Sequence, residues 1–340
     1  MKAFSRAPLR IGIAGGGTDL DVYYKKFGGN VVNTTISLFM HCEIELLEDN
    51  DKIIFESIDL GIKLEYDCKT KIVFDGSMDL YKAIYNKIVS RYLKKKVSIK
   101  LITKSDVPMG SGLGGSSTLV VAIIKAFDVL FNLGLDKRET AELAYEIERN
   151  DINIAGGYQD QYTASFGGFN IMYFNQDKSI EVKKLEIEET FLKNLEDSTL
   201  LYYTNISRKA HHIEKEKSLL INSEKSIESM HKIKNDALRV KDAIKHSDLK
   251  NLANLLNETW KNKKAVSSLV SNRGIDDIYD LAIKNGALGA KISGAGGGGF
   301  IFFIIDSKKS THLQKVLSSQ DGKIFPFNFV ENGVIGWKEQ

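Results

Sequence analysis

A glycine-rich loop that runs directly into an apolar helix is the segment of this chain best suited to chemistry. It covers residues 108–118, begins with a proline and holds four glycines and four hydroxyl residues. Glycines adopt positive φ angles and let a ligand approach the backbone. The first turn of the following helix has unpaired N–H groups, which bind phosphate. The candidate phosphate ligands are Pro108, Gly110, Ser111, Gly112, Leu113, Gly114, Gly115, Ser116 and Ser117.

Two well-known nucleotide motifs do not fit this loop. Gly110, Gly112 and Gly115 have the spacing of a dinucleotide fingerprint, which needs an acidic residue at a second strand's end about 20 residues later. Asp128 lies near that distance but inside the expected helix. A Walker A loop needs Lys where this chain has Ser116. The loop therefore predicts a different phosphate site, with a structural turn as the alternative.

A second candidate segment lies near the amino terminus. An expected strand that contains Arg10 ends in three glycines, residues 15–17, and is followed by Thr18 and Asp19. An acidic side chain at a flexible strand end is suited to hydrogen-bonding the hydroxyl groups of a polyol. The alternative is a surface turn that Thr18 or Asp19 caps.

Two carboxylates form the third candidate. Glu148 shares an expected helical face with Ala144, a partly apolar setting in which a lone carboxylate is costly. Asp160 follows a glycine pair in an uncharged neighbourhood. Phosphoryl transfer uses one carboxylate for a metal ion and one for the attacking hydroxyl. The alternative is a solvated Glu148 that pairs with Arg149 or Lys137.

The fourth candidate is the glycine-rich stretch 294–299, which lies between Lys291 and an apolar run, residues 300–305. A flexible linker would have this composition, but apolar residues flank it closely. We therefore expect a loop between packed elements that approaches a ligand or another backbone.

Composition limits the classes of protein that this chain can be. It has 340 residues, 43% of them apolar, which is enough for a large core and about two domains. Its 47 basic and 44 acidic residues are well mixed, which argues against a nucleic-acid or membrane partner. Cys42 and Cys68 have no zinc or redox spacing, and no signal peptide or membrane span is visible. These features predict a cytoplasmic protein.

The elements expected from the residue pattern make an α+β protein. Strands are expected at residues 9–14, 31–48, 52–57, 97–103, 169–174 and 200–204. Helices are expected at 118–132, after a capping box formed by Asp136 and Glu139, and at 207–246, 249–269 and 275–285. Near residue 195 the pattern changes from mixed strands and helices to long helical stretches, so we expect two domains, 1–195 and 196–340.

Together these segments resemble the motifs of the GHMP kinases, the family of galactokinase, homoserine kinase and mevalonate kinase. The three motifs occur in the family's order and extend from residue 6 to residue 300. The resemblance implies an N-terminal domain like ribosomal protein S5 domain 2 and a ferredoxin-like C-terminal domain. It also implies ATP as phosphoryl donor, Mg²⁺ as cofactor and a site between the two domains.

The resemblance also implies residue roles. Residues 112–117 would wrap the ATP phosphates, with Ser116 and Glu148 as Mg²⁺ ligands. Asp160 would orient or deprotonate the attacking hydroxyl, and Arg10 would lie beside the transferred group. The implied substrate-binding residues are Gly17, Thr18, Asp19, Gly296 and Gly297. Gly115 stands where the family usually has another serine, and Gly16 and Gly17 replace the Glu-His pair of galactokinase.

Within the family, the first and third segments most resemble the branch that acts on D-glycero-D-manno-heptose 7-phosphate. This implies transfer to the anomeric hydroxyl of a sugar phosphate in the synthesis of nucleotide-activated heptose. Kinases like L-fucokinase or galactokinase are the alternatives, and an inactive sugar-binding regulator or an NAD-dependent oxidoreductase would be of another class. The oligomeric state, including a homodimer, stays open.

A sugar phosphate needs a second anion site. Arg208, after an expected strand, is the first candidate, and Lys263, Lys264 and Arg273 are the others.

Overall fold

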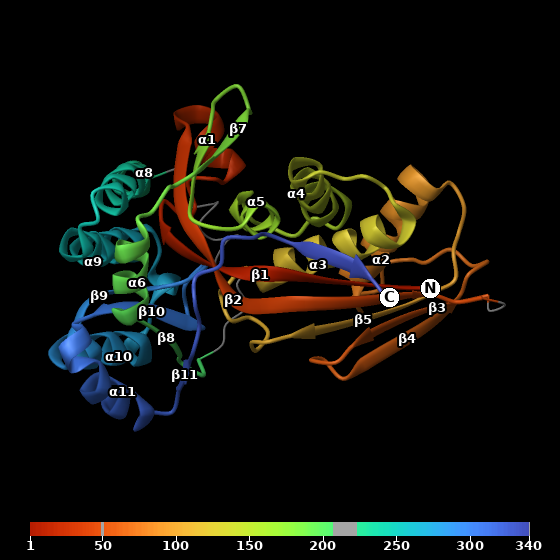
Figure 1. Ribbon diagram of the computed structural model, residues 1–340. Coiled ribbons are helices and arrows are strands. Elements are labelled where there is room, and N and C mark those ends of the chain that lie inside the picture. Colours follow the sequence, from red (N-terminus) through yellow and green to blue (C-terminus); the bar gives the residue numbers. More distant parts are fainter. Residues whose placement is uncertain (49–50, 207–222, 340) are drawn as a thin grey trace.

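The structure is a computed structural model that describes residues 1–48, 51–206 and 223–339 (Figure 1). Its larger sheet has eight strands in the order β12-β1-β2-β5-β3-β4, with β6 paired to β2 and β7 to β6. Only the β3–β5 pair is parallel among the described strands of this sheet. The strands are β1 (Lys2–Ala14), β2 (Gly29–Leu46), β3 (Lys52–Ser57), β4 (Ile62–Asp67), β5 (Ile99–Ser105), β6 (Asn170–Phe174), β7 (Ile180–Lys184) and β12 (Ile335–Lys338).

Helices cover one side of this sheet, as Figure 1 shows for α2, α3 and α4. Strand β5 alternates between buried and more exposed residues, as expected for a sheet with one face on the core. The helices of this part are α1 (Asp21–Phe27), α2 (Asp79–Ile88), α3 (Gly115–Phe131), α4 (Lys137–Tyr145) and α5 (Gln159–Phe166), with π-helical turns η1 (Val89–Leu93) and η2 (Glu146–Asp151). Helix α6 (Glu189–Asp197) lies with the second group of elements in Figure 1.

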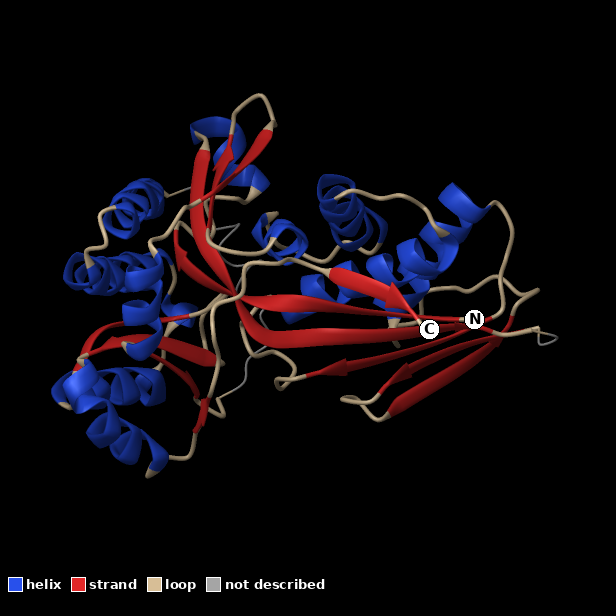
Figure 2. Cartoon of the chain, viewed as in Figure 1, coloured by secondary structure: helices blue, strands red, loops and turns tan. Residues whose placement is uncertain are grey.

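A second, antiparallel sheet has the order β11-β8-β10-β9 and its own group of helices (Figure 2). Its two central strands, β8 and β10, are buried along their whole length. The strands are β8 (Thr199–Tyr203), β9 (Ala287–Ile292), β10 (Phe300–Ile305) and β11 (Lys323–Phe325). The helices are α8 (Glu224–Lys245), α9 (Leu249–Val266), α10 (Arg273–Lys284) and α11 (Ser310–Ser318), with short 3₁₀ turns η3 (Ser268–Val270) and η4 (Ser307–Lys309).

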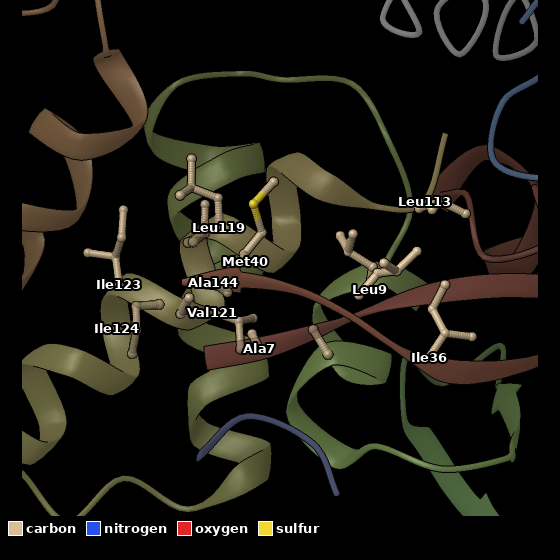
Figure 3. Close-up of a cluster of buried hydrophobic side chains, with 14 of the residues drawn as sticks. Ala7, Leu9, Ile36, Met40, Leu113, Leu119, Val121, Ile123, Ile124 and Ala144 are labelled. Atoms are coloured by element: carbon tan, nitrogen blue, oxygen red, sulfur yellow. The ribbon is translucent and has the colours of Figure 1, made fainter. Parts of the chain in front are cut away.

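Helix α3 packs on β1 and β2 and forms the centre of the larger core (Figure 3). Its apolar residues Leu119, Val121 and Ile123 are buried, and they belong to the same hydrophobic cluster as Leu9 of β1. Leu113, just before the helix, is fully buried in the same core. The core therefore fixes the position of the α3 amino terminus and of the glycine loop that leads into it.

Several expected elements match the structure, with informative differences. The capping box of Asp136 and Glu139 is confirmed at the start of α4. Helix α3 begins at Gly115, before the expected residue 118. Its N-cap residue is Gly114, whose backbone is in the left-handed region. Of the helix expected at 207–246, the structure describes only α8, since residues 207–222 lie outside the described part.

The last strand returns to the first sheet. β12 pairs with β1 over Ala3–Arg6, although the sequence division assigns residues 196–340 to the second domain. A separate finding is that no helix in the described ranges combines the length and the apolar character needed to cross a membrane.

Candidate active site

Segments far apart in the sequence meet in one pocket of about 340 Å³. The predicted site residues that line it are Arg10, Gly17, Asp19, Pro108, Gly110, Ser111, Gly112, Gly114, Gly115, Ser116, Ser117, Glu148 and Asp160. Elements that follow residue 223 add Ile233, Thr259, Lys263, Lys291, Gly294 and Ala295 to its wall. The pocket therefore lies between the phosphate loop, residues 108–118, and the second glycine loop, residues 294–299.

The phosphate loop needs its glycines for conformation and for space. Gly110, Gly112 and Gly114 have φ angles of 73°, 80° and 78°. A Cβ on Gly112 would lie 2.8 Å from the carbonyl oxygen of Ser293. Gly114 begins α3 without a side-chain cap, so the first-turn N–H groups of the helix are available to an anion.

Arg10 and Asp160 form a bidentate ion pair inside the pocket. Arg10 Nε donates to Asp160 Oδ1 at 2.7 Å, and Nη2 donates to Oδ2 at 2.9 Å. Arg10 Nη1 also donates to the carbonyl oxygen of Gly112 at 2.7 Å. Arg10 is buried, whereas the Asp160 side chain keeps 22% of its surface exposed. Two parallel hydrogen bonds fix the carboxylate plane, so Asp160 presents its remaining lone pairs in a defined direction.

Glu148 lies in the π-helical turn η2 and is fully buried. Its Oε1 accepts a hydrogen bond from Ser116 Oγ at 2.9 Å, and its Oε2 accepts one from Gln161 Nε2 at 2.5 Å. A single π-helical turn within a helix is frequent at functional sites. The solvated Glu148 that the sequence left open as an alternative is wrong, because the side chain points inward to α3 and α5.

The donor atoms of Ser116 and Glu148 suit Mg²⁺. A hydroxyl and a carboxylate are hard oxygen ligands, and Mg²⁺ is usually bound by one or two carboxylates together with waters and substrate phosphates. Among the described residues, no cluster of three or more His, Cys, Asp or Glu could hold a metal ion by itself. The pair therefore fits Mg²⁺, and waters or a phosphate group would have to supply the other ligands.

Asp19 is held firmly at another part of the wall. Its Oδ1 accepts hydrogen bonds from Gly17 N at 3.0 Å and from Gln159 Nε2 at 3.2 Å, and its Oδ2 accepts one from Gln159 N at 3.1 Å. A Cβ on Gly157 would lie 2.0 Å from Asp19 Oδ2, so this approach requires glycine. The segment that carries Asp160 therefore also fixes Asp19.

Some predicted ligands do not line the pocket. Thr18 is buried, and its hydroxyl binds the carbonyl oxygens of Gly15 and Asn30, so it holds the turn together. The Leu113 side chain lies in the core, and its carbonyl oxygen accepts a hydrogen bond from Arg10 N at 3.1 Å.

The second glycine loop meets the pocket at a different point from the one predicted. Gly297 N donates to Val270 O at 2.7 Å, and a Cβ on Gly296 would lie 2.7 Å from the same oxygen. These two glycines therefore allow the loop to pack on η3, whereas Gly294 and Ala295 line the pocket.

The candidates for a second anion site differ in burial, in partners and in whether they line the pocket. Lys263 is buried, lines the pocket and donates to the carbonyl oxygen of Gly294. Lys264 pairs with Asp276 and lies over the Trp260 ring, and the Arg273 side chain is 95% exposed. Arg208 lies outside the described residues.

The sequence analysis missed several residues that line the pocket or contact its side chains. Lys291 reaches from β9 to the carbonyl oxygen of Gly12, and Ser293 Oγ accepts a hydrogen bond from Arg10 Nη1 at 3.2 Å. The signal for Lys291 was a charge inside an apolar strand before a glycine loop. The signal for Gln159 and Gln161 was their position on either side of Asp160, but nothing in the sequence indicated their partners.

Arg149 and two tyrosines support the loop between η2 and α5. Arg149 donates to the carbonyl oxygens of Ile154 and Gly157, both at 3.2 Å. The rings of Tyr145 and Tyr158 stack with centroids 3.6 Å apart. Burial raises the pKa of Tyr145 to about 12, so this ring stays neutral at physiological pH. This packing holds Gly157 against Asp19.

Two glycines with the same backbone conformation provide a test of the pocket geometry. Gly114 and Gly134 have φ angles of 78° and 76°. A Cβ on Gly114 would lie 3.2 Å from the Asp160 carboxylate and 3.3 Å from Arg10 Cγ, whereas a Cβ on Gly134 meets nothing within 4 Å. We expect each Gly→Ala variant to lose about 1 kcal/mol of unfolding free energy. Only Gly114→Ala should lose catalytic activity, by about 10-fold, because it displaces the Arg10–Asp160 pair.

Urea unfolding and steady-state kinetics of both variants check this expectation. Equal loss of turnover in the Gly114 and Gly134 variants would show that backbone strain, and not displacement of the ion pair, controls activity.

Two family models and several known proteins match this chain. Residues 79–168 match the model of the GHMP kinases N terminal domain, and residues 240–320 match that of the GHMP kinases C terminal domain. The chain is 49% identical over 334 residues to D-glycero-alpha-D-manno-heptose 7-phosphate kinase of Campylobacter jejuni, and the match covers 98% of each chain. It is 29% identical to L-fucokinase/L-fucose-1-P guanylyltransferase of Bacteroides fragilis, over 93% of this chain and 36% of that longer protein.

A solved structure gives the same result for the fold. The crystal structure of a D-glycero-D-manno-heptose 1-phosphate kinase from Bacteroides thetaiotaomicron matches with a TM-score of 0.85 and 37% identity, and the match covers 99% of each chain. The predicted two-domain α+β fold is confirmed. Since both family models match in order and a relative is similar over nearly its full length, the chain belongs to the GHMP kinase family.

Proposed function

We propose that this kinase transfers the γ-phosphoryl group of ATP to the anomeric hydroxyl of D-glycero-D-manno-heptose 7-phosphate, which gives the 1,7-bisphosphate. The observation that carries the proposal is the convergence of the phosphate loop, the Arg10–Asp160 pair and the Ser116–Glu148 pair in one pocket. The choice of sugar is supported by the similarity to the Campylobacter jejuni kinase across nearly all of both chains. A pathway that makes nucleotide-activated heptose would use this product.

In the proposed reaction, the sugar hydroxyl attacks the γ-phosphorus. A new O–P bond forms, the bond from phosphorus to the ADP oxygen breaks, and the hydroxyl proton passes to Asp160. Asp160 orients the hydroxyl because Arg10 fixes both of its oxygens. The Arg10 guanidinium and the first-turn N–H groups of α3 stabilise the charge that develops on the phosphate oxygens. Positioning and electrostatics therefore supply most of the catalysis.

Ser116 and Glu148 would hold Mg²⁺ in this scheme. The ion, when bound, would neutralise charge on the phosphate oxygens of ATP. Glu148 is suited to this role because it is a fully buried carboxylate at the edge of the pocket, hydrogen-bonded to a serine of the phosphate loop. Gly115 carries no hydroxyl, so Ser116 is the proposed hydroxyl ligand in the first turn of α3.

We infer that adenine occupies a neighbouring apolar pocket of about 330 Å³. Met40, Met109 and Ile154 line both pockets, so the second one adjoins the phosphate loop. Leu60 and Tyr81 add apolar and aromatic surface to it. Such surfaces suit a planar base, while convergent polar groups in the larger pocket suit the triphosphate and the sugar.

The integrity of the acidic groups favours an enzyme over an inactive sugar-binding regulator. Glu148 and Asp160 are both present and both line the pocket. The two relatives described above, from Campylobacter jejuni and Bacteroides fragilis, are both named as kinases.

A screen of acceptors tests the proposal. ADP formation is coupled to a spectroscopic readout for heptose 7-phosphate, heptose 1-phosphate, free heptose, L-fucose and galactose, and phosphorus NMR locates the new phosphate. We expect heptose 7-phosphate to be the best acceptor and the new phosphate to be on the anomeric oxygen. Preferred phosphorylation of fucose or galactose, or addition to heptose 1-phosphate at its other end, would overturn the choice of substrate.

Asp160→Asn tests the role of the carboxylate. The amide cannot accept a proton, so kcat should fall by about 10²- to 10⁴-fold. The variant should fold, which its thermal melting temperature checks. Asp21→Asn is the matched control, because Asp21 lies in an exposed ion pair with Lys25 and should keep wild-type kcat. Wild-type turnover in Asp160→Asn would remove this residue from the mechanism.

We propose that Lys263 binds the phosphate that the sugar already carries. It lines the pocket and, with Gly16 and Gly17, a small cavity beside it, near the loop of Asp19. Lys263→Met should raise the KM for heptose 7-phosphate by about 10- to 100-fold, as loss of one hydrogen bond to a charged group would. The KM for ATP should change little.

The neighbouring lysine is the control for this prediction. Lys264 pairs with Asp276 away from the pocket, so Lys264→Met should keep both KM values. An equal rise of the KM for ATP and for the sugar phosphate in Lys263→Met would contradict the assignment, as would an equal loss with free heptose as acceptor.

A further inference from the structure

The Glu148 carboxylate has a different partner on each oxygen. Oε1 accepts from Ser116 of the phosphate loop, and Oε2 accepts from Gln161 Nε2 at 2.5 Å. Gln161 follows Asp160 in α5 and is fully buried. The residue after the proposed base therefore contacts the proposed metal ligand directly.

The chemistry of the contact fixes the amide orientation. An ionised carboxylate only accepts hydrogen bonds, so the side of Gln161 that faces Glu148 must be its NH₂ group. The amide is neutral, so it orients the carboxylate without cancelling its charge. Arg149 Nη1 lies 3.7 Å from Oε1, which makes an ion pair without a direct hydrogen bond. The hydrogen bond at Oε1 therefore comes from Ser116, and the one at Oε2 comes from Gln161.

The same amide nitrogen also ties three elements together. Gln161 Nε2 lies 3.1 Å from Ser117 Oγ, so one atom of α5 contacts η2 and the first turn of α3. Gln161 Oε1, in contrast, is buried without a hydrogen-bond partner among the described residues. An unsatisfied buried oxygen is unfavourable, so the amide does not serve stability alone. The function of this side chain lies in its donor nitrogen.

We propose that Gln161 is a positioning residue of the metal site: it holds Glu148 so that Oε1 faces Ser116 and the divalent cation. The inference rests on the proposed function, in which Ser116 and Glu148 hold Mg²⁺. Groups that orient a metal ligand from behind typically change metal affinity or activity by about 10- to 100-fold when they are lost. Gln161 would thus link the position of the metal ligand to the helix that carries Asp160.

Gln161→Met removes the donor with a small change of volume. The probe is Mn²⁺, titrated by electron paramagnetic resonance into the protein with bound ADP. We expect Mn²⁺ to bind about 10- to 100-fold more weakly than to the wild type. The lost kcat should return as the Mg²⁺ concentration is raised, which a general loss of structure would not allow. Mn²⁺ affinity within twofold of the wild type would overturn the proposal.

Gln159→Met is the matched control, because Gln159 lies two residues earlier and binds Asp19. It should raise the KM for the sugar phosphate and leave Mn²⁺ affinity unchanged. If the melting temperature shows that Gln161→Met does not fold, Gln161→Asn decides by the same criterion, since its amide is one methylene too short to reach Glu148.

Glu148→Gln separates this inference from the proposed function. Undiminished Mn²⁺ binding by Glu148→Gln would overturn the metal site itself. Loss of binding in Glu148→Gln together with wild-type binding in Gln161→Met would overturn only the role of Gln161.

Discussion

The site depends on a close backbone contact between two glycine loops that are far apart in the sequence. A Cβ on Gly294 would lie 2.5 Å from the carbonyl oxygen of Gly112, so the contact excludes any side chain. Phe300 N donates to Ser111 O at 3.0 Å beside it. This approach joins the second sheet to the phosphate loop. Because of it, Lys291 of β9 lines a pocket whose phosphate loop belongs to the first sheet, and Ser293, just after β9, contacts Arg10.

Charge is the second constraint on the pocket. A buried ion is costly unless hydrogen bonds and opposite charges surround it. Arg10 and Asp160 satisfy each other through two hydrogen bonds, and Glu148 is satisfied by a serine and a glutamine. These contacts hold the charged groups in place before a ligand binds. A site whose dipoles are already oriented stabilises developing charge without having to reorganise.

Both constraints help to explain why the sequence analysis succeeded for some residues and not for others. The phosphate loop and the capping box of α4 are local features, whose backbone conformation requires particular residue types. The second glycine loop was also found, but Gly296 and Gly297 serve its packing on Val270 while Gly294 lines the pocket. Composition indicates that a loop needs close approach. It does not indicate which neighbour each glycine approaches.

The sequence by itself determined the order of the motifs, the family they resemble, the phosphate loop with its helix, and the candidate acidic pair. These follow from local conformational requirements and from residue types at fixed spacing. Only the tertiary structure decided which side chains meet. Lys263 and Lys264 are neighbours in the sequence, but one turn of an α-helix takes 3.6 residues, so they point in directions about 100° apart. One enters the pocket and the other pairs with Asp276. Likewise, a π-helical turn and the packing of α3, α5 and η2 bring Glu148 to Ser116 and Gln161, and no spacing rule along the chain specifies such a contact.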